Sequence, residues 1–87
     1  MLASRDAAAQ LRAAVAVGLA AVTELGGSLA DIVRTRMYAV DPAECDAIGL
    51  AHGAIFAEHP PAATMVLVPG LLHPDMRVEI ELEAVVG

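Results

Sequence analysis

Near its C-terminal end the chain reads Met76-Arg77-Val78-Glu79-Ile80-Glu81-Leu82-Glu83-Ala84, in which apolar and charged side chains alternate at every position. Successive side chains of a β-strand point to opposite faces of a sheet, so this period of two predicts a strand over residues 76–86. Its charged face would carry Arg77, Glu79, Glu81 and Glu83. The opposite, apolar face must pack on other elements, which makes this strand part of a sheet with one covered side.

Helical periodicity replaces the period of two in the first part of the chain. Over residues 5–25 the larger apolar side chains recur every three or four positions and form one stripe, made of Leu11, Val15, Leu19, Val22 and Leu25. Asp6 lies in the expected first turn, where its charge suits the helix dipole, and Gly26-Gly27 ends the helix. The apolar run at 13–22 is too short to cross a bilayer, and we interpret it as part of a helix packed in a core.

The middle of the chain predicts two further strands with a second helix between them. Residues 32–40 alternate, with one face made of Val33, Thr35, Met37 and Ala39 and the other of Arg34, Arg36 and Tyr38. Asp41-Pro42-Ala43-Glu44 has the signature of a helix start, with a capping aspartate and a capping box. The helix stops at His59-Pro60-Pro61 and carries on one face Cys45, Ile48, His52, Ile55 and Phe56. A short apolar strand is expected over 62–68.

The predicted fold class is therefore α+β. The elements follow in the order helix, strand, helix, strand, strand, and we expect both helices to pack on one face of a mixed sheet. A chain of 87 residues is long enough for one domain, residues 1–87. Because Tyr38 and Phe56 are its only aromatic residues, the core is thin, which favours oligomerisation.

Charge and cysteine content argue against several classes of function. The net charge is −6 and the chain has no lysine. Nucleic acids and anionic membranes are bound through clustered basic side chains, so neither is an expected partner. The single cysteine, Cys45, cannot form an internal disulfide, which fits the cytoplasm. His52, His59 and His73 lack metal-ligand spacing, so we expect neither a metal ion nor another cofactor.

Some residues could take part in catalysis or ligand binding, and for each of them a purely structural role is the alternative. Glu79 is either an acid within a site or one member of a charged sheet face. Arg36 either holds a carboxylate or pairs with a glutamate across the sheet. Cys45 is two helical turns, roughly 10 Å, from His52, which is too far for direct proton transfer and favours a packing role for both.

Several short stretches, taken in order, resemble the Rid family, the YjgF-type reactive intermediate deaminases. The similar stretches are Leu25 to Val33, Tyr38 to Asp41, Ile55-Phe56, Pro61-Ala62, and Val78 to Glu81 with Ala84. Together they span nearly all of residues 5–86. The resemblance implies a homotrimer of α+β subunits that binds a small carboxylate at subunit interfaces. It also implies that the family's N-terminal strand pair is missing, so we expect a natural short form, a fragment, or a chain whose true start lies upstream.

The resemblance further implies an enzymatic activity. At one position that this activity depends on, the chain differs from the catalytic members of the family. Catalytic members hydrolyse reactive 2-imino acids or enamines to 2-oxo acids and ammonia, and an arginine after the Pro-Ala pair holds the substrate carboxylate. Ala63 stands at that position here. Of the family's site, Glu79 remains and would position or activate water. Arg36 and Tyr38, on one strand face, are the candidates for binding the substrate.

Three hypotheses about function stay open. The chain is an imine-hydrolysing enzyme, a non-catalytic module that binds a small carboxylate or oligomerises, or a shortened product without an independent function. Ala63 favours the second over the first, so we expect weak activity or none.

Overall fold

The computed structural model describes residues 5–87 and confirms the predicted order of elements. Along the chain these are α1 (Ala7–Glu24), β1 (Ile32–Ala39), α2 (Cys45–Ile55), β2 (Ala62–Leu67) and β3 (Val78–Ala84). Short 3₁₀ turns at Leu29–Asp31 and Pro42–Glu44 lead into β1 and α2. Each element begins and ends within a few residues of the range that its sequence pattern predicts.

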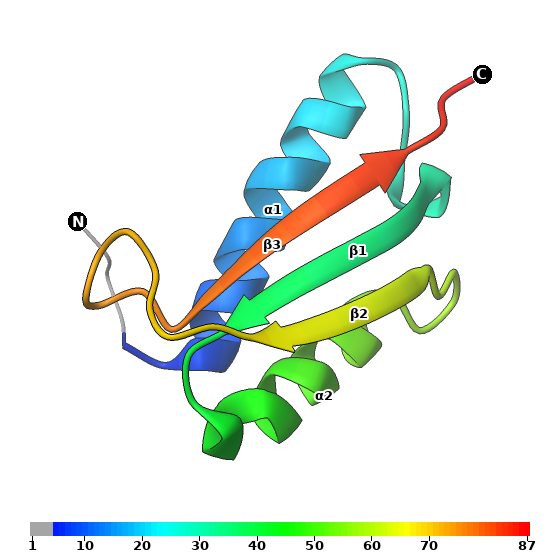
Figure 1. Ribbon diagram of the computed structural model, residues 1–87. Coiled ribbons are helices and arrows are strands. Elements are labelled where there is room, and N and C mark those ends of the chain that lie inside the picture. Colours follow the sequence, from blue (N-terminus) through cyan, green and yellow to red (C-terminus); the bar gives the residue numbers. More distant parts are fainter. Residues whose placement is uncertain (1–4) are drawn as a thin grey trace.

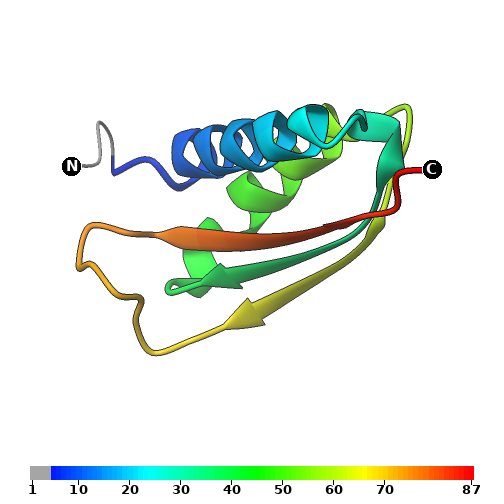
Figure 2. The same ribbon diagram turned by 90° about the horizontal axis from the view of Figure 1, so that it is seen from above.

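The three strands form one mixed sheet in the order β2-β1-β3. β1 runs parallel to β2 and antiparallel to β3, and α2 provides the crossover between the two parallel strands. Both helices lie on the same face of this sheet (Figures 1 and 2), which confirms the α+β architecture. The other face of the sheet carries no helix within residues 5–87.

The two ends of α1 are set by local side-chain chemistry. The carboxylate of Asp6 accepts a hydrogen bond from the Ala8 amide at 3.0 Å, so Asp6 caps the helix from just before its first turn. At the other end Gly26 has a φ of +88°, and the Gly27 amide donates to the carbonyl of Val22 at 2.9 Å. This is the hydrogen bond of a Schellman motif, in which glycine adopts the left-handed conformation at little cost.

The core lies between the sheet and the two helices. Its fully buried side chains include Leu11 from α1, Ile48 from α2 and Phe56, the residue that follows α2. At Gly18 α1 lies so close to β3 that an added Cβ would overlap the side chain of Leu82. α1 also has the length and hydropathy of a membrane-crossing helix, but core helices share those properties, and it packs here on β3 and α2.

Two side chains predicted for the core are exposed instead. Leu25 is 77% exposed because it follows the last helical residue, where the chain turns away at Gly26. Val33 is 46% exposed because a bulge in the pairing of β1 with β3 shifts the strand by one residue. Ile32 is buried in its place.

Candidate functional site

The predicted site residues on β1 and β3 meet on the sheet face that is free of helices. Tyr38 lies directly opposite Glu79, and Arg36 lies opposite Glu81. The Tyr38 hydroxyl donates a hydrogen bond to Glu81 Oε1 at 2.5 Å. The structure therefore brings Arg36, Tyr38 and Glu79 together on one exposed surface.

Arg36 is already engaged by its neighbours on this face. The pKa of the guanidinium lies above its ordinary value, mainly because of a hydrogen bond with Tyr38. The negative charges of Glu81 and Glu83 raise it further, by less. The hollow beside it has a volume of about 150 Å³ and is lined by both arginines of β1. Pockets for small molecules are typically 300 Å³ or larger, so this hollow suits one small polar group at most. Within residues 5–87, no three His, Cys, Asp or Glu side chains converge on a possible metal ion.

Ala63 lies on the other side of the sheet. It pairs in register with Thr35 on β1, whose side chain is buried under α2. Neighbouring residues in register share a face, so Ala63 belongs to the helix-bearing face and Glu79 to the open one. A single copy of the chain therefore does not bring these two predicted site positions together.

His52 and Thr35 form a buried polar pair beneath the sheet. His52 Nε2 lies 2.8 Å from Thr35 Oγ1, and its ring packs on Phe56 with centroids 4.6 Å apart. Burial lowers the pKa of the imidazole and keeps it neutral. This confirms a core role for His52. Cys45 is a half-buried free thiol whose Sγ lies 3.8 Å from the carbonyl oxygen of Asp41.

Arg77 does not lie on the charged face of β3, where the alternating pattern predicts it. It precedes β3 and turns away from the charged face, and its Nε and Nη2 donate to Glu44 Oε1 at 2.9 and 2.6 Å. Glu44, which was predicted to complete a capping box, instead binds the Arg77 guanidinium, and this hydrogen bond raises the pKa of Arg77. Asp41 Oδ2 lies 3.6 Å from Arg77 Nη2. Gln10 accepts from the Arg77 amide at 2.7 Å and donates to the Asp75 carbonyl at 2.8 Å.

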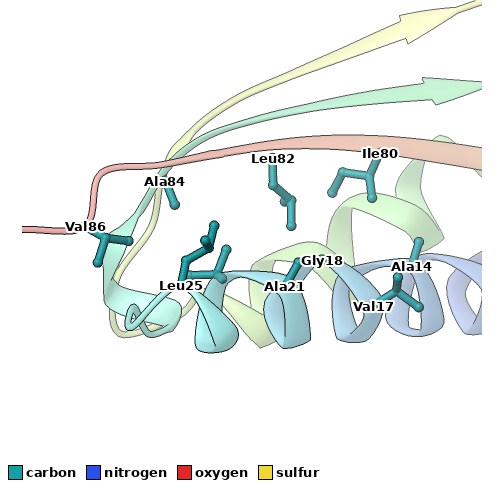
Figure 3. A pocket seen from close by; sticks show the side chains of 10 residues that line it. Ala14, Val17, Gly18, Ala21, Leu25, Ile80, Leu82, Ala84 and Val86 are labelled. Atoms are coloured by element: carbon teal, nitrogen blue, oxygen red, sulfur yellow. The ribbon is translucent and has the colours of Figure 1, made fainter.

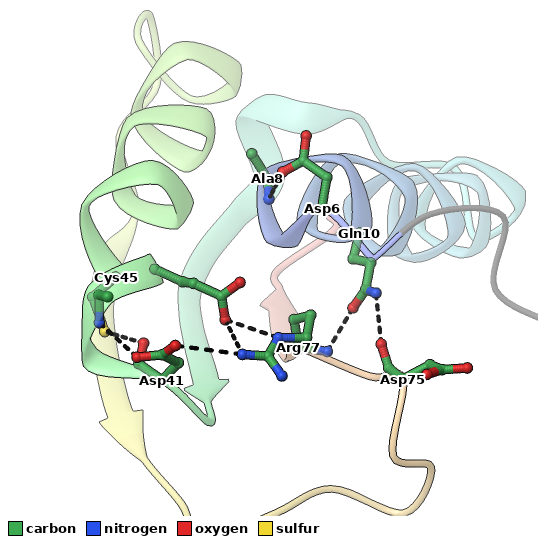
Figure 4. A network of polar contacts seen from close by, with 9 residues as sticks. Asp6, Ala8, Gln10, Asp41, Cys45, Asp75 and Arg77 are labelled. Atoms are coloured by element: carbon green, nitrogen blue, oxygen red, sulfur yellow. Dashed lines mark hydrogen bonds and ion pairs between the residues drawn. The ribbon is translucent and has the colours of Figure 1, made fainter.

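The polar network around Arg77 ties α1, the start of α2 and the approach to β3 together (Figure 4). Sequence reasoning missed it because its members are far apart along the chain. A polar Gln10 within the apolar pattern of α1 was the available signal.

Comparison with known proteins decides the family. The family model described as Endoribonuclease L-PSP matches residues 1–86. The chain belongs to this family. Solved structures similar to it include members named for YjgF/YER057c/UK114 and for the Rid family, so the predicted Rid resemblance is confirmed.

The relatives of this L-PSP family chain are longer than it is. The uncharacterized protein SCO2049 of Streptomyces coelicolor is 30% identical over 78 residues, which are 90% of this chain and 58% of that protein. Rv2704 of Mycobacterium tuberculosis is 38% identical with a TM-score of 0.92, over 97% of this chain and 71% of the other. The YjgF gene product of E. coli is 34% identical with a TM-score of 0.84, over 92% and 65%.

Proposed function

We propose that this chain is a member of the L-PSP family with weak or no imine-hydrolysing activity of its own. The observation that carries the proposal is Ala63, at the position where the family resemblance implies a carboxylate-binding arginine. A methyl group cannot donate the paired hydrogen bonds with which a guanidinium holds a carboxylate. The reaction of a 2-imino acid needs that carboxylate held still while water adds to the imine carbon.

The remaining charged groups do not replace the missing contact. Glu79 would manage protons for the attacking water, but it carries the same sign of charge as the substrate carboxylate. It is exposed in a row with Glu81 and Glu83. Arg36, the candidate substitute, is already engaged by Tyr38 and Glu81. An anionic substrate would have to compete with these partners for it.

The position of Ala63 also supports sites shared between subunits, in the homotrimer that the family resemblance implies. Ala63 and Glu79 lie on opposite faces of the sheet. A site that uses both positions has to take one from each of two copies. The open, charged face of the sheet provides a surface on which another copy would pack.

The alternative function is a non-catalytic module that binds a small carboxylate or serves as an oligomeric interaction surface. Arg34 and Arg36, adjacent on the open sheet face, favour it, since a guanidinium can hold a carboxylate without any catalytic step. Binding of such an anion to a chain that is inactive in hydrolysis would distinguish this function from catalysis.

The assay that tests the proposal measures ammonia released from a freshly generated 2-imino acid. We expect the unchanged chain to add little to the uncatalysed rate, and Ala63→Arg to raise it on the order of a hundredfold if the rest of the pocket is intact. Ala57→Arg, which adds the same charge at an exposed position after α2, serves as the control and should change nothing. Turnover by the unchanged chain that equals that of arginine-containing relatives contradicts the proposal. A folded Ala63→Arg variant without activity would show that Ala63 is not the missing element.

The family's name raises RNA cleavage as another activity, and the charges of this chain oppose it. Its net charge is −6, and the arginines of β1 lie opposite glutamates of β3. RNA binding depends on basic groups that release counterions from phosphates. We therefore expect no binding of labelled single-stranded RNA at physiological salt, measured by fluorescence anisotropy. Micromolar binding that weakens steeply with salt would contradict this expectation.

A further inference from the structure

A polar hollow of about 360 Å³ lies where β1 and β2 end and the chain turns back toward β3. Its walls come from the segments 40–41 and 69–77. An apolar hollow between α1 and β3 (Figure 3) borders the outer edge of β3, whereas the polar one takes no wall from that edge or from α1. β1 and β2 are parallel and joined by α2, and ligands commonly bind outside the carboxyl ends of such strands.

The loop that forms most of this hollow is held in place at both ends. At its start the Val68 amide donates to the Ala39 carbonyl at 2.9 Å, and near its end the Met76 amide donates to the His73 carbonyl at 3.0 Å. The side chain of Gln10 bonds to the backbone on both sides of Met76, at 2.8 and 2.7 Å. The walls are therefore formed before any ligand arrives, which lowers the entropy cost of binding.

Arg77 presents hydrogen-bond donors that its own contacts leave unused. Its Nε and Nη2 donate to Glu44, and its Nη1 makes no hydrogen bond or ion pair within residues 5–87. Figure 4 shows this nitrogen pointing away from the dashed contacts. Both N–H groups of Nη1 can therefore hold a carboxylate while the contact with Glu44 persists.

Two further polar side chains in the walls differ in what they offer. The Asp75 amide donates to His73 Nδ1 at 3.1 Å, so the proton of the neutral ring is on Nε2, which is a donor. Asp41 Oδ1 accepts from the Ala43 amide at 2.9 Å, while Oδ2 lies 3.6 Å from Arg77 Nη2 in a side chain that is 44% exposed. The hollow thus combines donors for an anionic group with a carboxylate oxygen for a cationic one.

The balance of charge limits which ligand fits this hollow. The charges of Arg77 and Glu44 offset each other, and Asp41 adds one negative charge. A simple anion would be repelled by Asp41, and a simple cation would leave the free donors of Arg77 unpaired. A small molecule that carries both charges satisfies both requirements. The apolar part of such a molecule would contact the apolar side chains of the walls, Val40, Leu71 and Met76.

We propose that this hollow binds a small zwitterion with an apolar body, of which an amino acid with an apolar side chain is the simplest example. Its carboxylate accepts hydrogen bonds from Arg77 Nη1 and His73 Nε2, and its ammonium group pairs with Asp41 Oδ2. A volume of about 360 Å³ is at the small end of the range for ligand pockets and suits one molecule of this size.

Three matched compounds test the proposal by amide chemical-shift titration of the purified, ¹⁵N-labelled chain. L-Leucine carries both charges, 4-methylpentanoate lacks the amine, and 3-methylbutylamine lacks the carboxylate. We expect saturable shifts centred on residues 40–41 and 69–77 with L-leucine, and binding at least about tenfold weaker for either analogue, because each loses a charge-assisted contact. Equal affinity of an analogue, or no saturable shift at about 20 mM L-leucine, would overturn the proposal.

Asp41→Asn tests the contact with the amine. Asparagine caps a helix as well as aspartate does, so this variant removes the charge and keeps the cap. L-Leucine should bind about fivefold more weakly or worse, and its preference over 4-methylpentanoate should narrow. Asp46→Asn removes the same charge from the exposed first turn of α2 and should change neither. Equal effects of the two variants would show that binding follows net charge and would reject the site.

His73→Ala tests the contact with the carboxylate. It should weaken L-leucine and 4-methylpentanoate alike, by about threefold or more, and leave 3-methylbutylamine unchanged. His59→Ala, at an exposed histidine outside the hollow, should affect none of the three. A loss of affinity in His73→Ala that 3-methylbutylamine shares would reject the proposed contact.

Discussion

At the scale of single residues, the Thr35–His52 pair shows how a core of small apolar side chains accommodates a titratable group. His52 is 7% exposed and Thr35 is fully buried. Each side chain is the hydrogen-bond partner of the other across the interface between α2 and β1. A buried hydroxyl or ring nitrogen without a partner typically costs 1–3 kcal/mol, so losing either side chain leaves the other uncompensated. The pair therefore specifies how α2 lies on the sheet.

The lowered pKa of His52 makes stability depend on pH. Above the unfolded-state pKa, about 6.5, the imidazole is neutral in both states and adds no pH dependence. As the pH falls below that value, the unfolded chain binds a proton that the folded chain does not, so the free energy of unfolding decreases. We expect a loss of up to about 1.4 kcal/mol per pH unit, which ends below the lowered folded-state pKa.

Urea unfolding followed by circular dichroism between pH 7.5 and about 5.5, above the usual carboxylate range, measures this slope. In His52→Gln the slope should disappear, whereas His59→Gln, at an exposed histidine, should keep it. A slope that survives in His52→Gln would assign the pH dependence to another group.

At the scale of elements, the helices depend on two glycines in opposite ways. Gly26 ends α1 with a φ of +88°, a conformation that other residues adopt only with strain. Gly49 lies inside α2, where glycine is a poor helix former and an added Cβ meets nothing within 4 Å. The same substitution at these two positions should therefore change stability in opposite directions.

We expect Gly26→Ala to lower the free energy of unfolding by about 1 kcal/mol and Gly49→Ala to raise it by about 0.5–1 kcal/mol. Thermal and urea unfolding of the two variants beside the unchanged chain provide the measurement. Destabilisation by Gly49→Ala would show that its surface packs on something, such as another copy of the chain.

At the scale of the whole molecule, residues 5–87 leave one sheet face uncovered and the outer edges of β2 and β3 unpaired. The face is polar, with Arg36, Tyr38 and three glutamates, and the β3 edge is bordered by an apolar hollow between β3 and α1. A thin core of alanine and branched aliphatic side chains gains stability when such surfaces are covered. The proposed trimer would cover the face.

Sedimentation velocity tests the assembly. We expect a species of three times the 8.9 kDa chain mass at micromolar concentration. Because the face is charged, Arg36→Glu should weaken assembly more than Arg12→Glu, which makes the same change on the exposed side of α1. A stable monomer at micromolar concentration would contradict the proposed trimer.

The amino-acid sequence by itself determined the elements, their order, and which face of β3 is apolar. These properties follow from local patterns: the period of two in β3, the helical stripe of α1, and the glycines that end it. The family resemblance also follows from short local stretches. Local patterns suffice here because the direction of a side chain relative to its own backbone is set by the element that contains it.

Contacts between distant segments were decided by the tertiary structure alone. The strand order left β3 at an edge, the bulge near Ile32 exposed Val33, and the register put Ala63 and Glu79 on opposite faces. Arg77 likewise left the charged face for Glu44, 33 positions away along the chain. Alternation within a strand predicts two faces, but register and strand order depend on pairing energies summed over the whole sheet.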